Sequence, residues 1–154
     1  MALTDPGFRP GLPATTTEVR SGPATDPLAW LATAPAHEER WFWEVPEDGL
    51  SWVGLGTTDV VSLDGPSRFD DAAHRAAGLL NDLEVEAPAD APQPRLAAGF
   101  AFDDTAPPGP WAPFGNGRLV LPAVQVLRRD DRTWVTRIDG ADRPTPVVAA
   151  PHPE

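Results

Sequence analysis

Acidic doublets are the side chains of this sequence whose spacing could support acid–base chemistry. Four of them stand at positions 38–39, 70–71, 103–104 and 130–131, and paired carboxylates can serve as general acid and base. Three of the four doublets fall in predicted turns or on an exposed helix face, where solvated carboxylates are expected. Asp103 differs because it ends a hydrophobic strand and could point into a cleft. Aspartate also ends strands for reasons of turn geometry alone, so both interpretations stay open.

The remaining reactive residue types give no second candidate site. His37, His74 and His152 lie far apart in the sequence, without the short spacing of a zinc site. The chain has no cysteine, which excludes thiol nucleophiles and disulfides. The run 54–56 is Gly-Leu-Gly, but it lacks the third glycine of a dinucleotide fingerprint. We therefore assign no catalytic, cofactor-binding or metal-binding residue, and expect no cofactor in this chain.

Charge and composition exclude several classes of function. The formal net charge is −11, and all 12 basic residues are arginine, scattered along the chain. An acidic chain without a basic stripe repels phosphate backbones, so nucleic-acid binding is not expected. The N-terminus lacks the pattern of a secretory leader, and no apolar run is long enough to span a bilayer. We expect a cytoplasmic protein with no membrane partner.

Proline and small residues mark the predicted domain boundaries. Residues 1–25 hold few large apolar side chains and are predicted to be a disordered N-terminal arm. Residues 139–154 contain four prolines and resemble a linker. The folded domain is therefore predicted at 26–138.

Two strands near the start of this domain are predicted to form a hairpin. Segments 40–45 and 50–55 flank the turn sequence Pro-Glu-Asp-Gly. A symmetric hairpin sets Trp43 opposite Trp52 and Trp41 opposite Gly54, where a ring can cover the glycine. Tryptophans at alternating strand positions favour a core role over a ligand platform.

The other elements complete an α+β fold on a mostly antiparallel sheet of about five to six strands. Asp26 and Pro27 predict the start of a short N-terminal helix. One long helix follows residues 64–67, with apolar residues at three-and-four spacing up to position 83. Further strands are predicted at 58–63, 96–102, 119–127 and 133–138. The predicted core comprises Trp41, Trp43, Phe69, Leu79, Leu80, Phe100, Phe102, Leu119 and Leu121.

Several segments, in this order, resemble the amino-terminal region of menaquinone-type isochorismate synthases, which are chorismate-utilising enzymes. The segments are Arg40-Trp41-Phe42-Trp43-Glu44, Gly54-Leu55-Gly56, Gly65-Pro66-Ser67-Arg68-Phe69, Gly99-Phe100-Ala101-Phe102-Asp103, the pair Trp111 and Phe114, and Arg118-Leu119-Val120-Leu121-Pro122. The match runs from about residue 26 to 138. No tryptophan-binding motif of the Leu-Leu-Glu-Ser type is present, which favours the isochorismate branch over anthranilate synthases.

The resemblance implies a scaffold rather than a complete active site. In the family, a lysine activates water, a glutamate protonates the leaving hydroxyl, and further glutamates bind Mg²⁺, all in a carboxy-terminal chorismate-binding part. This chain contains no lysine, and arginine cannot act as the base because it stays protonated. We expect an inactive N-terminal portion that binds the C-terminal half or self-associates. The alternative is a stand-alone, non-enzymatic binding module that kept this fold.

Overall fold

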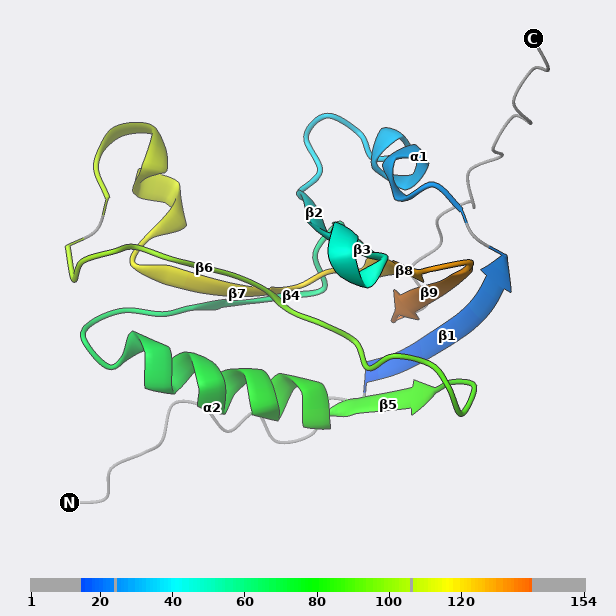
Figure 1. Ribbon diagram of the computed structural model, residues 1–154. Helices are drawn as coiled ribbons and strands as arrows, with labels where there is room; N and C mark the ends of the chain where they lie inside the picture. The colour runs from blue at the N-terminus through cyan, green and yellow to red at the C-terminus, as the bar shows by residue number, and fades with distance from the viewer. Residues whose placement is uncertain (1–14, 24, 106, 140–154) are drawn as a thin grey trace, which may run out of the picture.

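Two β-sheets organise the residues that the structure describes, 15–23, 25–105 and 107–139, in this computed structural model (Figure 1). The larger sheet has the strand order β2 (Arg40–Val45), β3 (Leu50–Leu55), β8 (Val124–Arg129), β9 (Arg132–Ile138), β1 (Thr15–Pro23) and β5 (Leu83–Glu86). Only β1 and β5 pair in parallel; every other neighbouring pair is antiparallel. The smaller sheet has the order β4 (Asp59–Ser62), β7 (Gly117–Leu121) and β6 (Ala97–Phe100), all antiparallel. The predicted α+β class on a mostly antiparallel sheet is confirmed.

The helices cover different sheets. Helix α1 (Pro27–Ala32) begins at Asp26, whose side chain accepts a hydrogen bond from the backbone N–H of Leu28 at 2.9 Å. Its Trp30 is fully buried and packs on the larger sheet against Val53 and Val126. Helix α2 (Arg68–Asn81) covers one face of the smaller sheet, where Ala72 contacts the cluster of Leu63 and Leu119. No helix of the described residues is long and apolar enough to cross a membrane.

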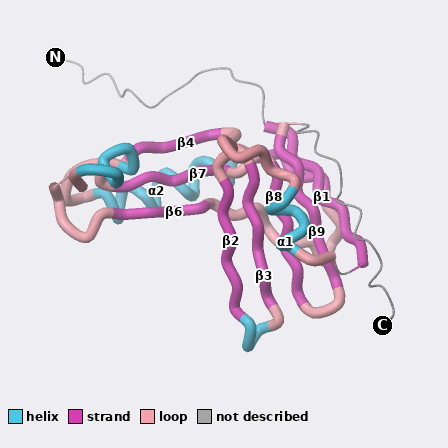
Figure 2. Tube along the Cα trace, turned by 90° about the horizontal axis from the view of Figure 1, so that it is seen from above, coloured by secondary structure: helices cyan, strands magenta, loops and turns pink. Residues whose placement is uncertain are grey.

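The two sheets run across one another. Figure 2 shows β4, β7 and β6 extending away from the strands of the larger sheet, with α2 along one side. Two 3-10 turns, η1 (Pro46–Asp48) and η2 (Gly109–Phe114), lie at the β2–β3 hairpin and after β6. The end of the smaller sheet that carries η2 is thus far from the larger sheet, and we call it the distal end.

The predicted hairpin register is confirmed. Trp43 pairs with Trp52 and Trp41 pairs with Gly54 across β2 and β3. Glycine is required at position 54 by close packing, because a Cβ there would lie 2.8 Å from Pro122 Cγ and 3.0 Å from Trp52 Cη2. The Gly-Leu-Gly run is therefore a packing feature of β3.

The prediction of a disordered arm over residues 1–25 is wrong for 15–23. These residues form β1, which pairs with both β9 and β5. The threonines at 15–17 and Val19 suit a strand, but the partners that order them lie more than 60 residues away in the sequence. Residues 1–14 and 140–154, which include most of the predicted linker, lie outside the described residues.

The strand predicted at 119–127 is also two strands, in different sheets. Strand β7 ends at Leu121 and β8 begins at Val124. Pro122 separates them because it has no N–H to donate to a ladder. Strand β5 occupies the end of the helical pattern that was predicted to reach position 83.

The predicted core is right only in part. Leu119 and Leu121 are buried, and Trp41 is half-buried against the core. Trp43 is 64% exposed, and Phe69, Phe100 and Phe102 are exposed as well. Leu79 and Leu80 are half-buried. The core instead consists of Val19, Trp30, Leu50, Trp52, Val53, Leu55, Leu63, Ala72, Ala97, Leu119, Val120, Leu121, Val124, Val126, Leu127, Trp134 and Ile138.

Candidate functional site

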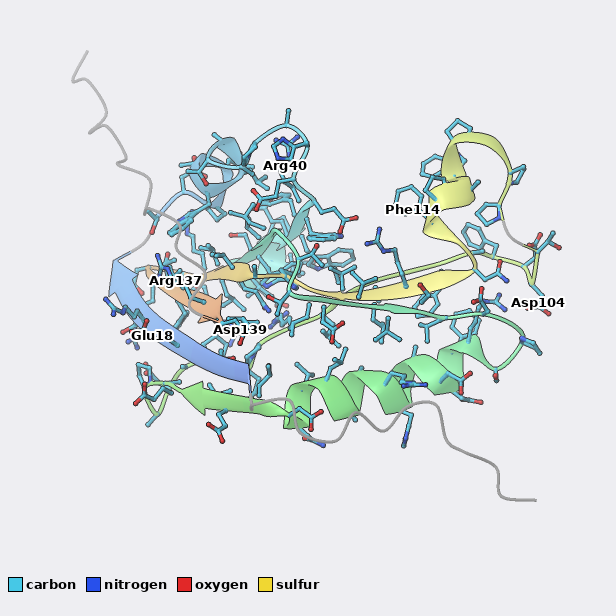
Figure 3. All side chains as sticks on the ribbon, turned by 180° about the vertical axis from the view of Figure 1, so that it is seen from behind. Glu18, Arg40, Asp104, Phe114, Arg137 and Asp139 are labelled. Carbon is cyan, nitrogen blue, oxygen red and sulfur yellow. The ribbon has the colours of Figure 1, made fainter. Side chains whose placement is uncertain are left out.

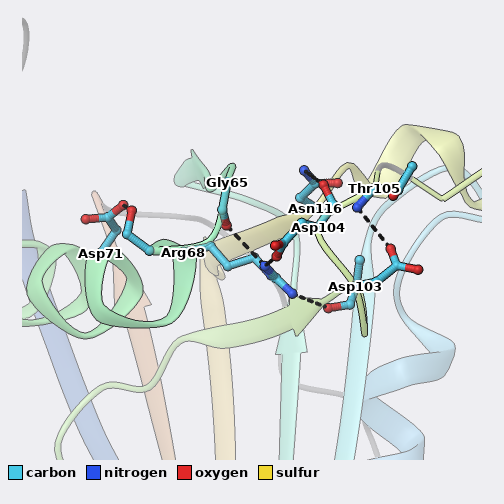
Figure 4. Close-up of polar contacts among 9 residues, drawn as sticks. Gly65, Arg68, Asp71, Asp103, Asp104, Thr105 and Asn116 are labelled. Carbon is cyan, nitrogen blue, oxygen red and sulfur yellow. Dashed lines mark hydrogen bonds and ion pairs between the residues drawn. The ribbon is translucent and has the colours of Figure 1, made fainter.

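Asp103, the carboxylate that could have pointed into a cleft, instead closes a turn. Its Oδ1 accepts a hydrogen bond from the backbone N–H of Thr105 at 3.0 Å, and the residue is exposed (Figure 4). This is the local side-chain-to-backbone bond that favours aspartate after a strand. The turn interpretation of Asp103 therefore accounts for its position.

The neighbouring Asp104 forms an ion pair with Arg68, which is buried at the start of α2. Only 3% of the Arg68 side chain is exposed, whereas Asp104 is 65% exposed. The guanidinium also donates to the carbonyl oxygens of Gly65 at 3.1 Å and Ala101 at 3.2 Å (Figure 4). Arg68 thus joins three segments, namely the turn before α2, the end of β6 and the loop that follows it.

Asn116, directly before β7, also forms hydrogen bonds with the loop that Arg68 contacts. Asn116 donates from Nδ2 to the carbonyl oxygen of Asp104 at 3.1 Å. Ala101 donates its N–H to the carbonyl oxygen of Asn116 at 2.9 Å, extending the β6–β7 ladder by one pair. The Nε of Arg68 is buried and has no partner among the described residues. A buried guanidinium that donates to two backbone oxygens and one carboxylate holds the loop firmly in place.

Exposed aromatic side chains gather around this fastened loop at the distal end. The rings of Phe69 and Phe100 lie 4.9 Å apart, and those of Trp111 and Phe114 lie 5.9 Å apart. Phe102, between β6 and η2, is fully exposed. Figure 3 places Phe114 and Asp104 at this end, far from Glu18 and Arg137 of the larger sheet. We call Phe69, Phe100, Phe102, Trp111 and Phe114 the distal aromatic surface.

The doublet at 38–39 also has a structural role. Both carboxylate oxygens of Glu39 accept from Arg118, at 2.7 and 3.1 Å, and Thr57 donates to the same carboxylate at 3.0 Å. This bidentate pair joins the segment directly before β2 to β7 of the smaller sheet. Asp71 of the 70–71 doublet accepts from the hydroxyl of Ser67 at 2.8 Å within the first turn of α2.

The tryptophan hairpin belongs to the core, as predicted, at Trp52 and in part at Trp41. Trp52 is buried and donates from Nε1 to Oε1 of the buried Gln125 at 3.3 Å. The same oxygen accepts from the backbone N–H of Arg95 at 2.8 Å, which fastens the loop before β6 to the larger sheet. Trp43 at the sheet edge remains exposed.

No group of three or more His, Cys, Asp or Glu residues that could hold a metal ion occurs among the described residues. His37 and His74 are exposed, and His152 lies outside the described part of the chain. The contacts of Arg68 and Glu39 each join one segment to another, whereas those of Asp71 and Asp103 are local. The distal aromatic surface, by contrast, is exposed, and exposed apolar side chains of this kind are suited to binding another molecule.

Sequence reasoning missed Arg68, although one signal was available. A cation in the first turn of a helix faces the positive end of the helix dipole, which is unfavourable without a compensating partner. Arg68 occupies this turn, and the compensation comes from Asp104, 36 residues further along the chain. The acidic doublet 103–104 could have been examined as that partner.

The fold and these contacts define an α+β domain with an exposed aromatic surface at its distal end. Its sequence matches the family described as chorismate binding enzyme over residues 11–142. This match spans most of the chain, and the protein belongs to that chorismate-utilising family. No curated protein matches the sequence. The resemblance to chorismate-utilising enzymes is thereby confirmed at the level of the family, and the matched residues include β1.

Proposed function

We propose that this chain is the N-terminal scaffold portion of an isochorismate synthase, in a menaquinone or siderophore precursor pathway, and that it is inactive alone. The observation that carries the proposal is the match to the chorismate binding enzyme family over residues 11–142 in a sequence without lysine. The segments around Trp41, Gly65 and Phe100 that resemble isochorismate synthases support the narrower assignment.

The chemistry of the reaction explains the proposed inactivity. Conversion of chorismate to isochorismate requires a base that activates water and an acid that protonates the departing hydroxyl. Arginine cannot supply the base, because its guanidinium stays protonated at any working pH. The carboxylates of Glu39, Asp71, Asp103 and Asp104 are engaged in turns and ion pairs.

The described residues also do not fit the Mg²⁺ that the complete family enzymes use, because no carboxylate cluster of the required size is found among them. We therefore propose that the base, the acid and the metal ligands come from a separate chorismate-binding part. In this proposal the chain contributes strands, α2 and the distal aromatic surface to the assembled enzyme.

The test is an isochorismate assay with chorismate and Mg²⁺, using the chain alone, the chorismate-binding part of an isochorismate synthase alone, and the two together. We expect product only from the mixture, because loss of a general base alone lowers rates by about 10²- to 10⁴-fold. Turnover by the purified chain above a buffer control would refute the proposal. Full activity of the chorismate-binding part alone, unchanged by the chain, would favour the stand-alone binding module instead.

A further inference from the structure

The two outer edges of the smaller sheet differ in whether a side chain occupies their outward backbone N–H groups. Among the described residues, β4 and β6 each pair only with β7, so each has one outer edge. Directly after β4, the Leu63 N–H donates to the carbonyl oxygen of Gly117 in β7. In an antiparallel ladder every second residue bonds to the partner strand, so Val61 faces β7 and the N–H of Val60 points to the outer edge. Asp59 Oδ1 accepts from that N–H at 2.7 Å. A charged side chain that occupies its own outer edge blocks pairing there.

The outer edge of β6 carries no such block. The Ala101 N–H bonds to Asn116 in the β6–β7 ladder, so the same alternation directs the backbone groups of Ala98 and Phe100 outward. Ala98 is exposed and has no polar side chain that could occupy the edge. An unblocked edge with small and apolar residues is a template for another strand.

Aromatic side chains flank this edge. Phe69 and Phe100 lie on the side that α2 covers, whereas Trp111 and Phe114 belong to η2 on the other side (Figure 1). With Phe102, they expose about 600 Å² of aromatic surface in total, divided between the two sides of the smaller sheet, taking roughly 200 Å² for a whole ring side chain. A strand added at the edge between the two sides would border both parts, which together approach the roughly 800 Å² that each partner buries in a stable interface.

The part of the surface next to Arg68 is held in place before any partner arrives. Arg68 fixes the loop after β6 through Asp104 and the Ala101 carbonyl oxygen. Its guanidinium also lies over the Phe69 ring, 4.7 Å from the centroid. Fixing apolar side chains in an exposed position lowers the ordering cost of binding.

Charge selects the partner. Exposed Asp70, Asp71 and Asp103 stand with Asp104 around the distal aromatic surface, and the chain carries a net charge of −11. A second copy would bring the same acidic rim and the same net charge, so self-association through this surface is opposed. A complementary partner presents apolar side chains flanked by arginine or lysine.

We infer that the outer edge of β6, with the distal aromatic surface, accepts an extended apolar segment with basic flanks from the chorismate-binding part. The identity of that partner rests on the proposed function; the edge and the surface do not. The added strand pairs with the outward backbone groups of Ala98 and Phe100, and its side chains cover the aromatic rings.

The test measures binding of the full chain to the separately expressed chorismate-binding part. Ala98→Pro removes the outward N–H and leaves the β6–β7 ladder intact, because proline is tolerated where its nitrogen faces away from the sheet. Val60→Pro is the matched control on the opposite edge. We expect Ala98→Pro to weaken binding at least tenfold and Val60→Pro to leave it within twofold.

Three further measurements do not depend on the folding of the proline variant. Phe102→Ser changes a fully exposed side chain, and we expect it to weaken binding about tenfold. Hydrogen exchange of the unmodified chain should show protection of the Ala98 and Phe100 amides on binding, without protection at Val60. Affinity should also fall as salt rises.

Several results would overturn the inference. They are no binding of the unmodified chain, unchanged binding of both Ala98→Pro and Phe102→Ser, or protection of the β4 edge instead of the β6 edge. Binding that Ala98→Pro weakens, but that yields no isochorismate, would leave the docking surface standing and refute the proposed function. If the mixture forms isochorismate and neither Ala98→Pro nor Phe102→Ser changes the amount, the proposed function stands and the docking surface is refuted.

Discussion

Arg68→Met should destabilise the chain more than a substitution of Asp104, its ion-pair partner, because two of the three groups that the guanidinium contacts are backbone carbonyl oxygens. The native guanidinium donates to the carbonyl oxygens of Gly65 and Ala101 and to Asp104. Methionine keeps much of the apolar volume and donates nothing. The half-buried Ala101 carbonyl oxygen loses its donor, which costs about 1–3 kcal/mol. The Gly65 carbonyl oxygen loses the shorter of its two bonds and keeps the one from the backbone N–H of residue 68 at 3.4 Å, whereas the loss of a pair with an exposed carboxylate costs at most about 1 kcal/mol.

These contributions are partly offset in Arg68→Met, because the unpaired buried Nε of Arg68 disappears with the charge. We therefore expect a net loss of about 2–3 kcal/mol in the free energy of unfolding. Asp104→Asn keeps an acceptor oxygen and should cost less than about 1 kcal/mol. Arg68→Lys should fall between them, since one ammonium cannot reach three acceptors in the geometry of the fork.

The assay for this series is urea unfolding of the full chain, followed by tryptophan fluorescence. The three variants should keep the native dependence of the unfolding free energy on urea, so that shifts of the midpoint report stability alone. Arg68→Met within about 0.5 kcal/mol of the native chain would refute the reasoning, because surface substitutions stay within that range. An equal cost for Asp104→Asn would show that the ion pair, and not the backbone contacts, fastens the loop.

Two further predictions concern single positions. Gly54→Ala should lower the free energy of unfolding by about 1–3 kcal/mol, since its Cβ would lie 2.8 Å from Pro122 Cγ in a packed core. Gly78→Ala, in the last turn of α2 with nothing within 4 Å of the added Cβ, should raise it by about 0.5–1 kcal/mol; the same sign in both variants would contradict the packing account. Asp103→Ala should cost less than about 1 kcal/mol, because it removes only the bond from the Thr105 N–H. It should leave isochorismate formation by the mixture unchanged, and a large loss of product would restore Asp103 as a catalytic candidate.

Local signals in the sequence predicted the parts of the fold that local interactions determine. The β2–β3 register followed from one turn and from symmetric pairing about it, which sets Trp43 opposite Trp52. The start of α1 followed from Asp26 and Pro27, and its cap is formed as expected. In each case the residues that decide the structure are close neighbours in the chain.

Distant pairing determines the parts that were missed. Residues 15–23 contain no local reason to be ordered, and become β1 because β9 and β5 supply hydrogen-bonding partners. The apolar run 119–127 is continuous in hydrophobicity, yet its two halves join different sheets at Pro122. Arg68 and Asp104 are likewise paired only once α2 and the loop after β6 are placed together.

The aromatic residues of the distal surface show what hydrophobic periodicity measures. Phe69 begins the apolar stripe of α2 and Phe100 alternates along β6, and both patterns predicted burial. In this chain Leu119 and Ala72 fill the space between helix and sheet, while both phenylalanines remain exposed beside it. Hydrophobic periodicity indicates that a side chain is buried, but it does not indicate whether its own chain or another chain buries it. If a strand adds to the edge of β6, the periodicity of Phe69 and Phe100 describes their burial in the assembled enzyme.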